Sequence, residues 1–233
     1  MADESPVLSP VAVDDLAVGR PWALAGRRDG LRLLVYDDTC TRDLIGPVGL
    51  THTWRVGAKL YAGLGRLDAA KPARNWVEAL EWLARVRPGE SIAEIQFWGH
   101  GNWGLARIGR DRLDQSALQP GSILHHGLRE VRERLTARSL WWFRTCETFG
   151  ASAGHDFAQA FTDFLGCDAA GHTHIIGPWQ SGLHRLAPGR RPHWSPTEGL
   201  RSGSPHDPRR AWRSQPWRPH TVHCLQGAFP SGW

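Results

Sequence analysis

The chain has 233 residues, of which 41% are hydrophobic and 22% are charged, and this is typical of one globular core domain with extra segments. The formal net charge is +5, and arginines of the last third supply much of this mild excess. No nucleic-acid motif and no platform of interleaved arginine and aromatic residues accompanies them. We therefore interpret the run as a solvated arginine-rich tail and expect no nucleic-acid partner.

The cysteine spacing and the distribution of apolar residues argue against a disulfide-bonded, secreted or membrane-spanning protein. The four cysteines, Cys40, Cys146, Cys167 and Cys224, form no CxxC pair and no framework of a small disulfide-bonded domain. The first six residues are acidic and polar, unlike a signal peptide, and no apolar run reaches the ~18 residues of a membrane span. We expect a cytoplasmic protein with reduced thiols and no membrane association.

The first half of the chain predicts a lead-in, a strand and a helix. Residues 1–30 form a loose lead-in, and the apolar run 31–36 reads as a buried strand that stops at Asp37 and Asp38. Residues 51–64 fit either a strand or a helix. Asn75 is a typical N-cap, and apolar residues follow it at helical spacing as far as Pro88-Gly89.

Six further elements are expected before the tail. They are a strand at 92–98, a hairpin at 103–109, a helix at 121–137, a strand at 140–145, a helix at 157–165 closed by Gly166, and a strand at 168–176. Beyond Pro188 the composition predicts irregular or partly disordered structure. Tryptophans in this tail, if exposed, favour docking on a partner protein or back onto the domain.

Alternation of short apolar strands and amphipathic helices predicts the fold class. We expect an α/β domain at residues 31–186, with a mostly parallel sheet and helices on both faces, followed by a Pro/Arg/Trp-rich extension at 187–233. In such sheets, functional sites form beyond the carboxyl ends of the strands.

Two strand ends carry reactive side chains. The strand at 92–98 leads into Gly99-His100-Gly101, and the strand at 140–145 leads into Cys146. One helical crossover separates them, so both strands belong to the same sheet, where neighbours lie ~4.8 Å apart. A thiol needs help to ionise at neutral pH, and an imidazole can accept and return its proton. Backbone N–H groups of Gly101 and Cys146 are candidate oxyanion donors.

Apolar strand, His-Gly, crossover, apolar strand and Cys together resemble the caspase-like superfamily of cysteine peptidases (clan CD), nearest in style to bacterial CHAT proteases and metacaspase-like domains. The likeness covers roughly residues 31–186. It implies a three-layer caspase-like sheet and a cysteine endopeptidase that acts through an acyl-enzyme. In it His100 is the general acid and base, Cys146 the nucleophile and Gly101 an oxyanion donor. The segment Arg144-Thr145-Cys146-Glu147-Thr148 differs from the caspase Gln-Ala-Cys-Arg-Gly.

The resemblance also suggests which residues line the substrate pocket, but not which charge the pocket prefers. Arg144 points to the same side of its strand as Cys146 and would favour an acidic substrate residue. Asp37 and Asp38, at the end of the first strand, would favour a basic one. Alternatively, Arg144 only forms an ion pair with Glu147 or Asp37.

Two other segments have open interpretations. His172 and His174, with Cys167 upstream, have the spacing of a ligand pair on one strand face, but no third ligand has a recognisable spacing. We therefore expect no metal and no cofactor, and a polar strand near the site. The segment 177–184, rich in glycine and aromatic residues, fits either a substrate-lining loop or an ordinary turn.

Three functions compete at this stage. The leading hypothesis is a cysteine endopeptidase acting on a protein or peptide substrate. The second is a non-catalytic caspase-like module that binds a partner protein, and the third is a basic protein associated with nucleic acid. Because relatives are often activated by cleavage, calcium or a partner, an activator protein is a further expectation.

Overall fold

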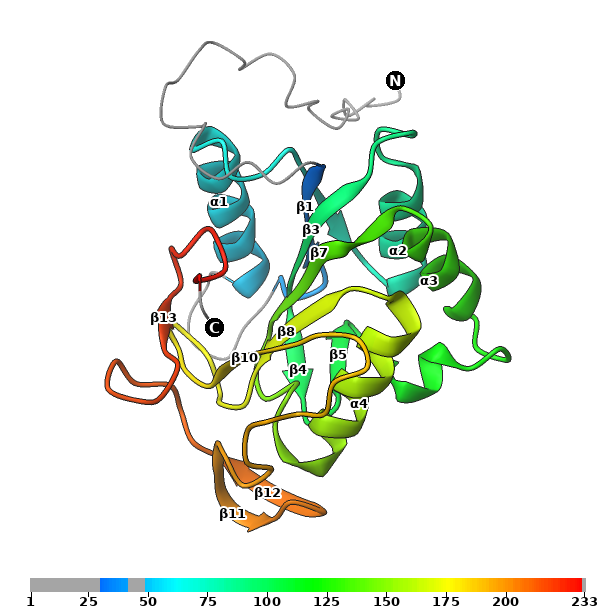
Figure 1. Cartoon of the computed structure of the whole chain (residues 1–233). Helices are drawn as coiled ribbons and strands as arrows, with labels where there is room; N and C mark the ends of the chain where they lie inside the picture. The colour runs from blue at the N-terminus through cyan, green and yellow to red at the C-terminus, as the bar shows by residue number, and fades with distance from the viewer. Residues whose placement is uncertain (1–29, 42–48, 232–233) are drawn as a thin grey trace, which may run out of the picture.

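The structure, a computed structural model, describes residues 30–41 and 49–231. The lead-in predicted at residues 1–30 lies, except for Gly30, outside the described residues. A six-stranded sheet with the order β10-β8-β7-β3-β1-β2 crosses the middle of the molecule (Figure 1). Its strands are β1 (Leu31–Asp37), β2 (Ala69–Ala73), β3 (Ile92–Trp98), β7 (Leu135–Arg144), β8 (Asp168–His172) and β10 (Leu183–Leu186). Only β10 pairs antiparallel, which confirms the mostly parallel α/β sheet.

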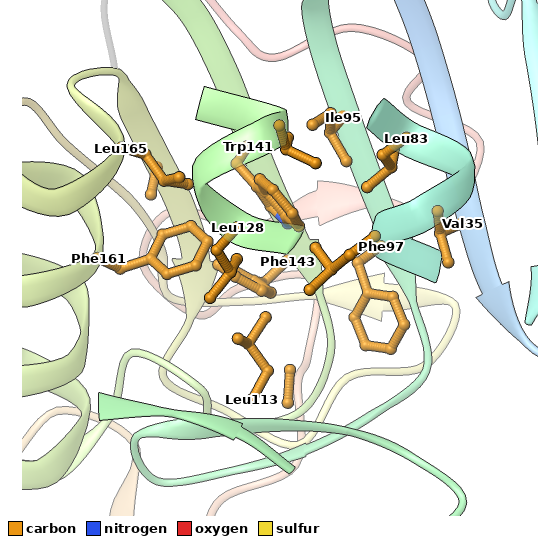
Figure 2. Packing of buried hydrophobic residues seen from close by; sticks show 14 of the residues in the cluster. Val35, Leu83, Ile95, Phe97, Leu113, Leu128, Trp141, Phe143, Phe161 and Leu165 are labelled. Carbon is orange, nitrogen blue, oxygen red and sulfur yellow. The ribbon is translucent and has the colours of Figure 1, made fainter. Parts of the chain in front are cut away.

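Helices cover both faces of this sheet. They are α1 (Leu50–Gly63), α2 (Trp76–Arg85), α3 (His125–Arg132) and α4 (Ala151–Leu165). Helices α2, α3 and α4 pack on one face, where Leu83, Leu128 and Phe161 meet Phe97 and Trp141 of the sheet (Figure 2). On the other face, α1 packs on β1 and β3 (Figure 1).

Along the central strands, successive apolar side chains point to opposite faces of the sheet, and this explains why both faces of the sheet are apolar. Phe97 and Phe143 enter the core beneath α2 to α4, whereas their neighbours Trp98 and Trp142 enter the clusters on the opposite face. Successive side chains of a strand point to opposite faces, so a strand covered on both sides reads as a continuous apolar run.

Three smaller sheets complete the fold. Directly after β3, a three-stranded sheet contains β4 (His100–Asn102), β5 (Leu105–Ile108) and β6 (Asp111–Asp114), and the 3-10 helix η3 (Gln115–Leu118) follows it. Near the other end of the chain, β11 (Leu200–Ser204) pairs with β12 (Asp207–Ala211), and β9 (Trp179–Gln180) pairs with β13 (Val222–His223). The hairpin predicted at 103–109 is thus larger than expected and includes His100.

Local signals place several element ends correctly. The Asn75 side chain accepts a hydrogen bond from the Glu78 N–H at 2.8 Å, as expected of an N-cap. Gly166 follows α4 with a φ of 68°, the left-handed conformation that glycine adopts without steric cost. The strand predicted at 92–98 is β3 without change.

Tertiary pairing overrides other predictions. The helix expected at 121–137 is only α3, because the backbone from Arg134 onward pairs with β3: the Ile92 N–H donates to Arg134 O at 2.8 Å, and Leu135 lies opposite Ile92. The stretch 51–64, which fits either a strand or a helix, belongs to helix α1. Strand β2 was not predicted. The strand expected at 168–176 ends at His172.

The C-terminal extension is mostly irregular but packs against the sheet. Beside the β11–β12 hairpin, the chain returns to the sheet, where Val222 and Phe229 pack against Trp142. The prediction of irregular structure beyond Pro188 is correct for most of residues 188–231, with β11, β12 and β13 as the regular parts, and long-range apolar contacts order the segment. Among the helices in the described part of the chain, none has both the length and the apolar character of a membrane span.

Candidate functional site

The register of the two central strands brings His100 and Cys146 to one edge of the sheet. Trp98 lies opposite Arg144 in the β3–β7 pair, and each candidate residue follows its strand by two positions. Parallel neighbours lie ~4.8 Å apart, so the two backbones leave the sheet side by side. Both side chains line one cavity of about 360 Å³.

Three parts of the chain wall this cavity. Helix α1 forms one side, the ends of β3 and β7 form the floor, and the segments around residues 177 and 224 close the other side. The lining residues are Leu50, Thr53, Trp54, Gly57, Tyr61, Trp98, Gly99, His100, Arg144, Cys146, Ile176, Gly177, Pro178, Gln180, Cys224 and Leu225. Apolar walls with few polar groups are typical of a pocket that binds a small molecule or a side chain.

The imidazole of His100 is held by a second thiol that the sequence did not reveal. Its Nε2 lies 3.1 Å from Sγ of Cys40, and its ring meets the edge of the Trp54 ring at a centroid distance of 5.9 Å. Sγ of Cys40 also donates to Oδ2 of Asp37 at 3.5 Å. Asp37, Cys40 and His100 therefore form a chain of polar contacts at the end of β1.

The direction of these contacts assigns the imidazole tautomer. A thiol has one proton, and in the Cys40–Asp37 contact it points to the carboxylate. We therefore assign Sγ of Cys40 as the acceptor of Nε2–H of His100, and in this assignment Nδ1 is the unprotonated nitrogen. Nδ1 is thus the His100 atom able to take up a proton.

Cys146 has a thiol that stays protonated at rest. Burial raises the pKa of Cys146 to about 11, and its Sγ lies 4.0 Å from the carbonyl oxygen of Ile176. Within residues 30–41 and 49–231, the hydrogen bond of the His100 ring goes to Cys40 and none joins His100 to Cys146. The two groups share a cavity without touching in this state.

Gly101 lies against the backbone of the Cys146 loop. A Cβ at this position would be 2.4 Å from Oγ1 of Thr148 and 2.5 Å from the carbonyl oxygen of Cys146, too short for any real contact. Only a glycine permits this approach between β4 and the loop that follows β7.

Arg144 is buried at the floor of the cavity and forms no ion pair in the described residues. Its guanidinium donates to Oε1 of Gln180 at 3.0 and 3.1 Å, to the Tyr61 hydroxyl at 2.9 Å, and to the carbonyl oxygens of Cys224 and Gln226 at 2.8 and 3.0 Å. Burial lowers the pKa of Arg144, but an arginine keeps its charge at neutral pH. The ion pair considered with Glu147 or Asp37 is therefore absent. The acceptors named above are neutral, and the Glu94 carboxylate acts on Arg144 electrostatically.

The Asp37 carboxylate does not face the cavity, contrary to expectation. It is fully buried and accepts from the backbone N–H groups of Thr39 and Gly109 and from the Thr39 hydroxyl, in addition to Cys40. A carboxylate at a strand end is a good acceptor for the turn that follows it, and that local demand directs Asp37 away from the pocket.

The remaining predicted residues have mainly structural surroundings. His172 and His174 are buried, and desolvation lowers their pKa values to about 3 and about 4. No cluster of three or more His, Cys, Asp or Glu side chains with metal-binding geometry occurs in the described residues. Of the loop 177–184, Gly177, Pro178 and Gln180 line the cavity, in agreement with the substrate-lining interpretation.

Fold and site together define an α/β protein with a mostly parallel six-stranded sheet and a cavity at its carboxyl edge that His100 and Cys146 both line. No protein-family model matches the chain, and comparison with curated proteins and with solved structures gives no match either.

Proposed function

We propose that this chain is a cysteine endopeptidase of the caspase-like type that acts on a protein or peptide substrate. The observation that carries the proposal is that His100 and Cys146 line the same cavity at the carboxyl edge of neighbouring parallel strands. The α/β sheet with helices on both faces is compatible with the three-layer fold that the resemblance implies.

The chemistry follows from the two side chains. Nδ1 of His100 takes the proton of the Cys146 thiol while the sulfur attacks a substrate carbonyl carbon, and the imidazolium then protonates the leaving amine. A thioester links the acyl group to Cys146. His100 next removes a proton from water, which attacks the thioester and releases the carboxylic acid and the thiol.

Asp37 and Cys40 act in this proposal as positioning residues. They hold Nε2 of His100, which leaves Nδ1 as the nitrogen that takes up a proton in the proposed reaction. Gly101 packs closely on the Cys146 loop. In this proposal the backbone N–H groups of Gly101 and Cys146 stabilise the oxyanion of the reacting carbonyl.

The proposal is tested with a library of fluorescence-quenched peptides in reducing buffer. Cys146→Ala should abolish cleavage, because the proposed acyl-enzyme forms on the Cys146 sulfur and not on the thiols of Cys40 or Cys224. Cys224→Ala is the matched control: Cys224 lines the same cavity but lies on the C-terminal segment, so cleavage should persist. Persistent cleavage by Cys146→Ala, or no cleavage by the wild type, contradicts the proposal.

The pocket charge predicts the sign of the preferred substrate residue. The Arg144 guanidinium carries a buried positive charge without a carboxylate in contact, whereas Asp37 is turned away. We expect otherwise identical substrates with Asp or Glu before the scissile bond to have a kcat/KM about tenfold or more above those with Lys or Arg. Equal or reversed values in this paired comparison contradict the assignment.

Substituting Gly101 tests the packing beside the thiol. In Gly101→Ala the new Cβ displaces the Cys146 loop, and a misplacement of this size is expected to lower kcat/KM about a hundredfold. Gly121→Ala is the control, since nothing lies within 4 Å of a Cβ there, and it should match the wild type. A kcat/KM of Gly101→Ala within twofold of the control would contradict the role of Gly101 in the site.

A specific observation favours a second candidate, a non-catalytic module that binds a partner protein. His100 contacts Cys40 rather than Cys146, and the pKa of Cys146 is raised to about 11 by burial, so the resting thiol is unreactive. The two candidates differ in the library assay. The module predicts no cleavage by the wild type and partner binding that Cys146→Ala leaves intact.

A further inference from the structure

A second hollow lies on the other side of the loop that carries Cys146. It measures about 690 Å³ and is lined by Asn102, Trp103, Glu147, Ile175, Arg201, Arg209, Arg210, Ala211, Trp212, Arg213, Gln215 and Arg218. Five of these residues are arginines, and Glu147 supplies the only carboxyl group among them. We call this hollow the arginine groove.

The arginines of the groove are held by few internal partners. Arg209 has a weak ion pair with Asp207 at 3.5 Å, in which both side chains are about 75% exposed. Arg201 and Arg218 lie over the Trp212 ring at 5.3 and 4.8 Å, and Nε of Arg218 is buried with no hydrogen-bond partner in the described residues. The ring therefore positions the two guanidinium groups themselves, and no carboxylate of the described residues forms an ion pair with either of them.

The groove adjoins the candidate catalytic site in the sequence, and Arg213 of its lining acts electrostatically on the Cys146 thiol. Glu147 follows Cys146 in the chain, Asn102 and Trp103 follow His100-Gly101, and Ile175 precedes Ile176 of the first cavity. An extended polypeptide advances about 3.3 Å per residue. A substrate whose carbonyl lies at Cys146 therefore reaches the groove within a few residues.

We infer that the arginine groove binds an acidic segment of the polypeptide substrate, on the side of the scissile bond away from the Arg144 pocket. This inference rests on the proposed function for the identity of the ligand. Carboxylates fit because guanidinium groups bind them through paired hydrogen bonds. The groove lies next to the Cys146 loop, where the proposed reaction acts on a polypeptide. This position favours a polypeptide over a nucleic acid as the ligand of the groove.

The binding arm of the test does not need catalysis. Fluorescein-labelled hexaglutamate, hexalysine and a Gly-Ser hexapeptide are titrated with Cys146→Ala protein, and anisotropy is followed at several salt concentrations. We expect hexaglutamate to bind most tightly and to weaken as salt rises. Adding Arg210→Gln and Arg213→Gln should weaken it about tenfold. Arg110→Gln with Arg129→Gln, an equal loss of charge at exposed positions outside the groove, should not.

Three outcomes would overturn the inference. They are equal binding of hexaglutamate and the Gly-Ser peptide, equal weakening by the control pair, and tight binding of a single-stranded DNA 12-mer without binding of hexaglutamate. The kinetic arm compares substrates with and without three glutamates on each side of the scissile bond. Glutamates after the scissile bond should lower KM in the wild type but not in Arg210→Gln with Arg213→Gln, and an effect confined to glutamates before the bond contradicts the inference. Absence of any cleavage refutes the proposed function instead. The anisotropy measurement still tests the binding of hexaglutamate in that case.

Discussion

His100→Ala is expected to lower kcat/KM about a thousandfold at pH 7 and to regain activity about tenfold for each pH unit up to pH 10. The reason is the Cys146 thiol: burial raises its pKa to about 11, so only about one molecule in ten thousand carries the thiolate at pH 7. Without an imidazole to take the proton, attack depends on this fraction, which grows in proportion to hydroxide concentration until the pH approaches the thiol pKa.

The measurement is a pH–rate profile of kcat/KM for the wild type and His100→Ala with one substrate. The wild type should depend much less on pH, because the imidazole takes the thiol proton, whereas the variant should rise with unit slope. Two controls frame the result. His126→Ala removes an exposed histidine of α3 and should follow the wild type, and His100→Ala with Cys146→Ala should be inactive at every pH. A flat profile for His100→Ala contradicts the role assigned to the imidazole.

Arg144→Met is expected to lower the free energy of unfolding by about 3 kcal/mol or more. The substitution keeps a long apolar stem but leaves Oε1 of Gln180 without its donor inside the protein. The carbonyl oxygens of Cys224 and Gln226 also lose a donor and share the single proton of the Tyr61 hydroxyl. Each buried acceptor left unpaired costs about 1–3 kcal/mol. Because those carbonyls belong to the C-terminal segment, its docking on the sheet should weaken as well.

Urea unfolding followed by tryptophan fluorescence measures the effect. Arg110→Met is the matched control, since Arg110 is exposed in the turn between β5 and β6, and its unfolding free energy should stay within about 0.5 kcal/mol of the wild type. A loss below about 1 kcal/mol in Arg144→Met would mean that water or a rearranged side chain replaces the guanidinium contacts.

Local chemistry made part of the fold predictable. The strand β3, the Asn75 cap and the Gly166 end of α4 depend on residues near each other in the sequence, so their patterns were sufficient. By contrast, α3 ends early because the chain after it pairs with β3, a partner about 40 residues away. The strand β2 was missed because its sequence, Ala-Ala-Lys-Pro-Ala, has no alternating pattern and forms an edge of the sheet.

Only those parts of the candidate site whose positions follow from the sheet topology could be predicted from the sequence. Parallel strands joined by a crossover end at the same edge, and this places His100 and Cys146 in one cavity. The partners of Arg144 were not accessible, since the carbonyls of Cys224 and Gln226 come from residues about 80 positions away. Cys40 follows β1 at the same edge, which was the available signal, but a thiol in a turn has no motif that links it to a histidine.

The central claim is that Cys146, with His100, attacks the carbonyl group of a substrate. A peptidyl acyloxymethyl ketone with aspartate as its last residue tests it most directly, with the labelled residue located by peptide mass spectrometry. We expect one adduct on Cys146 in the wild type and in Cys224→Ala, and none in Cys146→Ala or, at pH 7, in His100→Ala. An adduct on Cys40 or Cys224 instead, or undiminished labelling of His100→Ala, would contradict the account.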